Sequence, residues 1–227
     1  MDNFISLLQF ADGLFPAGAY AHSFGLEYYV QSGEVRDAGG VEQFLRAHLE
    51  GSNAPTDAVA LLCAWRAAKV GDLATCIALD ETLDAMKAVS ELRDASRQMG
   101  RQTLRVANHL LGHPLLSSFG EAVTNESTAG HHPVVLGIIG GVIEWLPKEM
   151  AAAYLYSTSA ALVGAALRLI PLGQLAGQRI LSNLTPLIAQ LAAEVQDKTQ
   201  GDMWTFAPAL EIAGMRHAML DARLFRS

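Results

Sequence analysis

Met150–Leu167, MAAAYLYSTSAALVGAAL, is the stretch that decides the fold, because it runs for 18 residues without a charge. An uncharged run of this length is near the lower limit for a helix that spans a membrane. Its tyrosines, its Ser-Thr-Ser and Gly164 interrupt the apolar pattern, and its alanines add little hydrophobicity. We therefore predict a helix that is buried on all sides within protein, and no membrane span.

The sequence around this stretch is also short of charge. Between Glu149 and Glu194 the only charged residues are Arg168 and Arg179, and charged residues make up 17% of the 227. Ordinary soluble domains carry roughly 25%. The hydrophobic share of 51% excludes a disordered chain. Because large exposed apolar patches usually mark interaction sites, we expect partners to cover part of this C-terminal third.

Helical patterns continue on both sides of Met150–Leu167. Apolar positions recur at spacings of three and four, and no alternating strand pattern stands out. Residues 134–139 have strand propensity, but the neighbouring glycines favour a short buried helix. The predicted helices cover 4–12, 22–31, 40–50, 55–69, 73–83, 87–111, 116–122, 133–144, 147–170, 172–196 and 208–220. We predict an all-α fold, a single compact domain of roughly ten helices over residues 1–227, with 221–227 as a flexible tail in the isolated chain.

Glycines, prolines and capping residues set the predicted helix ends. Gly51-Ser52-Asn53 is predicted to end the third helix, and Pro55 to open the fourth. Asp72 is predicted to cap the fifth. The segment 124–132 is polar and is predicted to be a loop.

Composition and motifs exclude several classes of function. A net charge of -7 argues against a general nucleic-acid binder. The chain has neither a G-x-x-x-x-G-K-[ST] loop for a nucleotide nor a G-x-S-x-G nucleophile elbow. The paired acids Asp80-Glu81 lie in a segment that we predict to be solvated. Two cysteines make no disulfide framework, and the N-terminus lacks the basic region of a secretory signal. We therefore expect a cytosolic protein without catalytic residues of its own.

Four histidines leave one alternative open. His109 and His113 are four residues apart, which would place two imidazoles on one helix face, although Gly112 and a proline break the helix there. His131 and His132 are adjacent in the polar loop. Capping and surface polarity explain all four, and the alternative is a helical metalloprotein that uses them as ligands.

Two sets of arginines can each be interpreted in two ways. Arg93, Arg97, Arg101 and Arg105 recur every four residues and so lie near one face of a helix. That face is either solvated or a ladder that binds acidic groups within the protein or on a partner. Arg168 adjoins a predicted helix junction at a proline. This junction also holds Gln174, Gln178 and Arg179, and either braces the fold or recognises a partner.

Short motifs in a fixed order resemble the UreF family of urease accessory proteins. They are LLQFAD (7–12), LFPAGAYAHSFGLE (14–27), SRQMGR (96–101), AYLY (153–156), RLIPLGQ (168–174), APAL (207–210), MRH (215–217) and RLFRS (223–227). Each motif is modest alone, but together they span nearly the whole chain.

The resemblance implies an all-helical, non-enzymatic protein that joins UreD, called UreH in some bacteria, and the GTPase UreG. That assembly delivers nickel to the urease apoprotein, and UreF-like proteins tend to form homodimers and to modulate the GTPase of UreG. Nickel and GTP are handled by the partners, so the resemblance implies no cofactor and no metal ligand in this chain.

The resemblance also implies where partners bind. Tyr20 matches the aromatic position of a Pro-x-Gly-x-Tyr loop that contacts UreG, and Arg168 matches a basic position on a surface proposed to meet UreG. Arg223 matches the arginine of the terminal Arg-Leu-Phe-Arg-Ser, which is linked to the same contact as Tyr20 through the tail, and the tail becomes ordered when UreD binds. The family's His-Glu-x-x-Tyr-Ser-Arg is here His217-Ala218-Met219-Leu220-Asp221-Ala222-Arg223, so tail contacts that use the missing Glu, Tyr and Ser are not expected, while Arg223 itself remains. The full set of predicted partner-binding residues is Tyr20, His22, Arg168, Gln174, Gln178, Arg179, Arg216, His217, Arg223 and Arg226.

Overall fold

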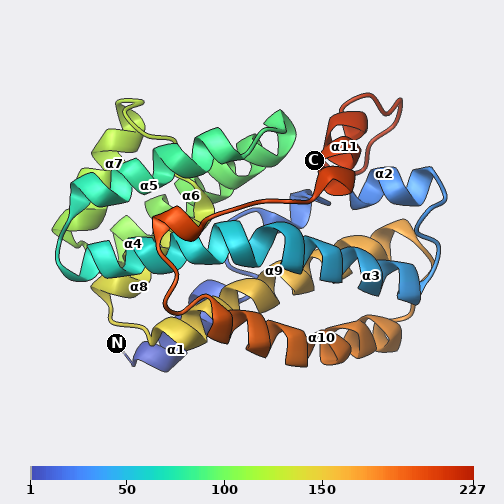
Figure 1. Ribbon diagram of the computed structural model, residues 1–227, viewed down its shortest axis with the longest axis horizontal. Helices are drawn as coiled ribbons and strands as arrows, with labels where there is room; N and C mark the ends of the chain where they lie inside the picture. Colours follow the sequence, from blue (N-terminus) through green and yellow to red (C-terminus); the bar gives the residue numbers. More distant parts are fainter. Residues whose placement is uncertain (1) are drawn as a thin grey trace.

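The computed structural model describes residues 2–227, and within them the regular elements are helices without a strand (Figure 1). The α-helices are α1 (Asn3–Ala11), α2 (Leu26–Gln31), α3 (Ala38–His48), α4 (Val59–Lys69), α5 (Leu73–Met86), α6 (Ser90–Leu111), α7 (Pro114–Thr124), α8 (His132–Val142), α9 (Pro147–Leu169), α10 (Gln174–Glu194) and α11 (Pro208–His217). The shorter helical segments are η1 (Ala19–Ala21), the π-helix η2 (Leu49–Ala58) and η3 (Gln200–Asp202). The predicted all-α fold is confirmed.

Helix α8 is the innermost helix, packed against α4 on one side and α6 on another. Its glycines explain how it fits there. A Cβ atom at Gly137 would collide with the carbonyl oxygen of Leu61, and one at Gly141 would lie 2.6 Å from the carbonyl oxygen of Trp65. The missing side chains therefore let the backbones of α8 and α4 approach closely. The strand-prone residues 134–139 are helical, as predicted.

Helix α9 is not buried on all sides, so that prediction is wrong. It packs along α10, which runs antiparallel to it (Figure 1), but only half of its most apolar window is buried. Tyr156 is 46% exposed, and the small residues Ala161 and Gly164 face a cavity instead of another helix. Length and composition would allow α9 to cross a membrane, but the core helix of a soluble protein passes the same test.

The charge-poor stretch buries most of its apolar side chains within the chain itself. Within Met150–Ala193, only Tyr156 and Leu175 are among the exposed large hydrophobic residues of the described chain. Most of the others lie on α1, on the loop after it, and from residue 204 into the tail, while Val70, Leu110 and Leu146 lie near the ends of other helices. The apolar surface that we expected partners to cover is therefore mostly elsewhere.

Helices α3, η2 and α4 form one continuous rod, so the predicted break at Gly51-Ser52-Asn53 is wrong (Figure 1). Pro55 has no N–H to donate to the preceding turn. The extended segment 203–207 supplies the missing donors: the N–H of Phe206 donates to the Gly51 carbonyl at 2.9 Å, and that of Trp204 to the Pro55 carbonyl at 3.3 Å. The contact with the distant segment 203–207 thus keeps α3, η2 and α4 continuous.

Helix α2 begins at Leu26, four residues later than predicted. Phe24 and Gly25 have positive φ angles of 50° and 87°, which a right-handed helix does not allow. Most other helices end within a few residues of the prediction. Asp72 caps α5 by accepting from the Thr75 N–H, and Gly112 ends α6 in the left-handed conformation.

Replacing Gly100 by alanine is expected to lower the free energy of unfolding by about 1–3 kcal/mol. A Cβ atom there would collide with the carbonyl oxygen of Gly130, which lies in the loop between α7 and α8. Gly164 is the matched control, because it is also helical and a Cβ there meets nothing within 4 Å. Gly164→Ala should stabilise by about 0.5–1 kcal/mol. Urea unfolding compares the two, and equal effects would contradict the assigned packing.

Candidate functional site

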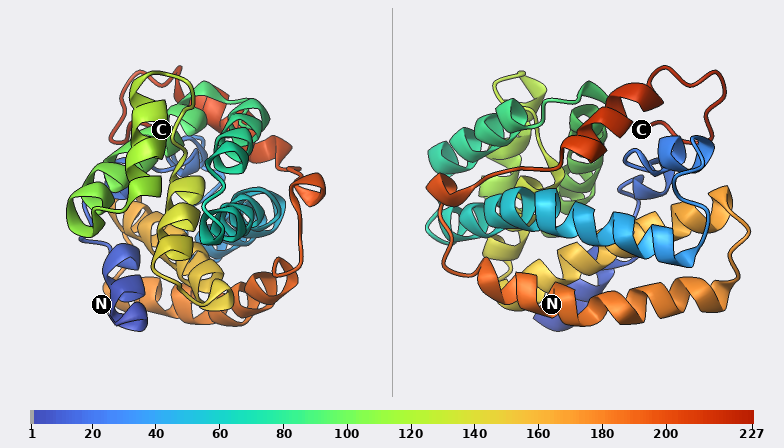
Figure 2. Two further views of the ribbon diagram at one scale, coloured as in Figure 1. Left: turned by 90° about the vertical axis from the view of Figure 1, so that its left-hand side faces the viewer. Right: turned by 45° about the vertical axis from the view of Figure 1, so that its right-hand side comes forward.

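The C-terminal residues pack against the loop that follows α1 and against α2 (Figure 2, right). Phe225 is 4% and Ser227 2% exposed. The Ser227 main-chain oxygen accepts from the N–H groups of Ser23 and Phe24, at 2.5 and 3.0 Å, and from the Ser23 hydroxyl at 2.9 Å. We call this region the tail-docking site and define it as residues 19–28, Glu91, Arg168, Arg216, His217 and 223–227.

A buried carboxylate, Glu27, holds the tail by its main chain. Its two oxygens accept from the N–H of Leu224 at 2.7 Å and of Phe225 at 3.0 Å. Burial alone would raise the pKa of this carboxyl group. The bonds from these two N–H groups and from His217 outweigh the burial, and they hold the pKa of Glu27 below its usual 4.5. Glu27 is therefore ionised in its docked setting.

His217 connects α11 to two acids on other helices. Its Nε2 lies 3.0 Å from Glu27 on α2, and its Nδ1 lies 2.7 Å from Glu91 on α6. Arg223 adds a guanidinium, with Nη1 2.8 Å from Glu91. Two carboxylates, an imidazole and a guanidinium thus meet where the tail begins.

His22 lies at the other end of the tail and is 3% exposed. Its Nδ1 is 2.8 Å from the Ser227 hydroxyl. Burial, and after it the charge of Arg226, lowers the pKa of His22 to about 4, so this imidazole is neutral at pH 7. The main-chain N–H of Arg226 donates to the Ala21 carbonyl at 2.9 Å, and the side chain of Arg226 is exposed.

Exposed arginines and a tyrosine border the docked tail. The Arg168 guanidinium lies 4.3 Å over the Phe225 ring and donates to the Tyr20 carbonyl at 2.9 Å. The Tyr20 ring itself is 75% exposed. Arg216 donates to the Tyr28 hydroxyl at 2.6 Å. The tail and the loop after α1 thus hold Arg168, and α2 holds Arg216, while both arginines remain exposed.

Apolar side chains extend this surface. The most exposed of them on α11 and beyond it are Ile212, Met215, Met219 and Leu224, between 50% and 83% exposed. Aromatic residues, Met and Arg are the types enriched at protein interfaces. The arrangement is therefore suited to recognising a protein.

The structure brings seven of the ten predicted partner-binding residues to the tail-docking site. The three others, Gln174, Gln178 and Arg179, lie exposed on the first turns of α10 and make no hydrogen bond to the tail-docking site within residues 2–227. Sequence reasoning missed Glu27 and Glu91 as the groups that hold the tail. Glu27 does stand within one of the quoted motifs, but one glutamate at a helix start gives no sign of burial. The flexibility of 221–227 in the isolated chain stays a prediction.

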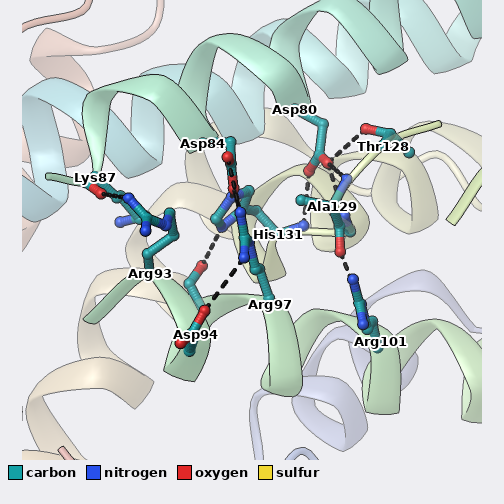
Figure 3. A network of polar contacts seen from close by, with 12 residues as sticks. Asp80, Asp84, Lys87, Arg93, Asp94, Arg97, Arg101, Thr128, Ala129 and His131 are labelled. Carbon is teal, nitrogen blue, oxygen red and sulfur yellow. Dashed lines mark hydrogen bonds and ion pairs between the residues drawn. The ribbon is translucent and has the colours of Figure 1, made fainter. Parts of the chain in front are cut away.

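A second polar cluster fixes the loop between α7 and α8 (Figure 3). Asp80, predicted to be solvated, is fully buried, and its carboxylate accepts from the Thr128 hydroxyl at 2.7 Å and from the N–H groups of Ala129, Gly130 and His131 at 2.7–2.8 Å. The prediction for Asp80 is wrong because the spacing of polar and apolar residues along a helix does not show that the loop at 128–131 covers this carboxylate.

The arginine ladder largely binds groups within the protein (Figure 3). Arg97 pairs with Asp84 and Asp94, Arg93 donates to the Lys87 carbonyl at 3.0 Å, and Arg101 donates to the Ala129 carbonyl at 2.9 Å. These contacts favour the reading in which the ladder meets acceptors inside the protein.

The four histidines do not converge. His113 caps α7 by accepting from the Leu115 N–H, and His131 contacts Ser96 and Asp84. His132 lines a cavity that none of the other three histidines lines. Residues 2–227 hold no group of three or more His, Cys, Asp or Glu placed to hold a metal ion. The metalloprotein alternative therefore has no site in the part of the chain that the structure describes.

Stability is expected to fall as the pH drops from about 6.5 to about 4. His22 and His48 are buried, and burial above all lowers the pKa of each to about 4 from 6.5. Between these values the unfolded chain binds more protons than the folded one, so the full contribution is present above pH 6.5 and is lost on acidification. Urea unfolding across this range measures the slope. His22→Gln should make the slope shallower, and an unchanged slope would contradict the assignment.

Comparisons with known proteins agree with one another. A family model described as UreF matches residues 35–185. The chain is 30% identical over 227 residues to a protein of Bacillus sp. (strain TB-90), covering 100% of both chains. It is 32% identical over 228 residues to one of Lachnoclostridium phytofermentans, again covering 100% of both. It is 33% identical to one of Paenarthrobacter aurescens, covering 98% of this chain and 97% of the relative. Each of the three relatives is named "Urease accessory protein UreF".

Proposed function

Since this chain belongs to the UreF family of urease accessory proteins, we propose that it is a non-catalytic scaffold that joins UreD (UreH) and the GTPase UreG. In this proposal the assembly delivers nickel to the urease apoprotein in the cytoplasm, and the chain modulates the GTPase of UreG. The nickel and the GTP are held by the partners, and the chain itself works as a homodimer without a cofactor.

The observation that carries this proposal is the tail-docking site. Exposed Tyr20, Arg168, Arg216 and Arg223 surround a docked tail whose own side chain Leu224 is 54% exposed. Arginines can form charge-assisted bonds to a partner's acids, and the apolar side chains between them can be buried in an interface. In this proposal UreG binds this face, and the tail changes its order when UreD binds.

Co-expression tests the assembly as a whole. A tagged UreD-like protein should retain this chain, and the pair should then retain the UreG-like GTPase. Failure of the UreD-like protein to retain the folded chain would contradict the proposed scaffold role.

Arg223→Ala and Tyr20→Ala are each expected to weaken retention of UreG while changing stability by less than about 1 kcal/mol. The Tyr20 ring is 75% exposed, and the Arg223 pair with Glu91 is 41% exposed on the arginine side. Arg105→Ala is the matched control, because Arg105 is an exposed arginine on α6 outside the tail-docking site. Co-purification and thermal melting give the two readouts.

Equal UreG retention by Arg223→Ala and Arg105→Ala would contradict the assignment of this face. Removing all of 223–227 is a poor substitute for the point variants. We predict from the burial of Phe225 and Ser227 that the truncation also lowers stability.

A further inference from the structure

A cavity of about 370 Å³ lies beneath the loop that follows α1. Its walls come from the ends of α1 and α3, that loop, η2, Lys87, α6, the start of α8, and α9. One part of the wall is apolar and largely aromatic, formed by Phe10, Phe15, Phe24, Leu92 and Met99. Cavities of this size and lining, with a few polar groups at one end, are typical of small-molecule sites.

The polar end of the cavity is formed by a buried ion pair and by the side chains that bond to it. Lys87 Nζ lies 2.7 Å from Asp57, whose other oxygen accepts from the Tyr154 hydroxyl at 3.1 Å and from the Asn53 amide at 3.3 Å. The side chains of Lys87 and Asp57 are only 14% and 8% exposed. Removing such a pair from water is unfavourable, so packing alone does not explain its place in an otherwise apolar helical core.

Three buried polar atoms that line this cavity have no hydrogen-bond partner within the described chain. They are Nδ1 of His48, which is 6% exposed and stacks on the Phe44 ring, Oδ1 of Asn53, which is 4% exposed, and Nδ1 of His132. A buried polar group without a partner is destabilising by about 1–3 kcal/mol, so each such group calls for an occupant of the cavity.

The charge at the polar end indicates what this occupant is. Lys87 and Asp57 cancel each other. Burial lowers the pKa of His48 to about 4, with Asp57 opposing and Lys87 adding to the effect. The imidazole is therefore neutral at pH 7, and an ionic guest would bring an unbalanced charge into a desolvated end. A neutral imidazole and an amide oxygen in the wall of one cavity together offer a donor and an acceptor.

We propose that this cavity binds a small uncharged organic molecule with a flat apolar body and an amide-like end that both donates and accepts hydrogen bonds. The apolar body lies against the phenylalanines, and the amide-like end meets His48 and Asn53. Tyr20 and Arg168 border the same cavity, so the occupant lies directly under the tail-docking site. This inference does not depend on the proposed scaffold function.

Binding can be followed on the unmodified chain with benzamide and benzoate as probes, because they share a ring and differ in charge. Methyl-labelled methionine gives the NMR readout through Met99 in the cavity wall. Benzamide should shift the Met99 methyl signal in a saturable way. The affinity for benzoate should be lower than that for benzamide by a factor of about ten or more. No shift of Met99 with benzamide would mean a cavity that holds water only, and equal binding of benzoate would contradict an uncharged guest. Either result overturns the proposal.

Two variants locate the guest. His48→Phe keeps an aromatic ring beside Phe44 and removes one of the polar groups that would bind the amide, so benzamide binding should fall about tenfold while toluene binding is retained. Ala161→Phe fills the cavity from α9 and should abolish binding of both. His109→Phe is the matched control, because His109 is exposed at the end of α6. Unchanged benzamide affinity in folded His48→Phe would overturn the assigned orientation and, with it, the proposal.

Discussion

Replacing Glu27 by glutamine is expected to release the tail and to lower the free energy of unfolding by about 3 kcal/mol or more, because each buried donor left without an acceptor costs about 1–3 kcal/mol. Glutamine keeps the shape of the side chain but has one acceptor oxygen instead of two. The N–H groups of Leu224 and Phe225 then compete for it, and an amide group faces one of them. The imidazole of His217 loses one of its two carboxylate partners.

Urea unfolding and hydrogen exchange of the tail amides measure this effect. Glu34→Gln is the matched control, since Glu34 follows α2 and is exposed, and it should change stability by less than about 0.5 kcal/mol. The pKa of Glu27 is depressed when folded, so its contribution is complete above about 4.5 and is lost as the pH falls through the folded value. Protected tail amides in Glu27→Gln would contradict the role given to this carboxylate.

Replacing Asp80 by asparagine is expected to lower the free energy of unfolding by more than about 3 kcal/mol. The carboxylate accepts four bonds, three of them from consecutive main-chain N–H groups of the loop between α7 and α8. Asparagine presents its NH₂ to some of these donors and leaves them buried without an acceptor. The loop of residues 125–131 should then lose its fixed conformation.

Glu81 supplies the control, because it is the next residue on α5 and is exposed. Glu81→Gln should remain within about 0.5 kcal/mol of the parent chain. Hydrogen exchange of the Ala129 and Gly130 amides reports on the loop directly. Similar exchange rates in the Asp80 and Glu81 variants would show that the carboxylate does not hold the loop.

Local signals in the sequence predicted most of the fold. Asp72 and Gly112 mark their helix ends because capping and left-handed glycine depend on a few neighbouring residues. The failures involve distant contacts. Gly51 and Pro55 would break an isolated helix, but the segment 203–207 donates to their carbonyl groups and the helical rod continues.

The candidate site was predictable in its exposed residues and not in its buried ones. Tyr20, Arg168 and Arg223 stand in recognisable motifs and lie together in the structure. Glu27, which is buried, and Glu91, which is half-buried, carry no local sign of their role, because the groups that cover them come from the other end of the chain. The same limit applies to Asp80, which looks like any surface acid of an amphipathic helix.

The contact between Ser23 and Ser227 joins residues 204 positions apart. During translation the loop that follows α1 therefore leaves the ribosome long before the tail residues 223–227 that dock on it. Until these residues are made, the N–H groups of Ser23 and Phe24 lack their acceptor. The helical rod likewise awaits the donors of the segment 203–207. The face beside Tyr20 therefore forms only after residues 223–227 have been made.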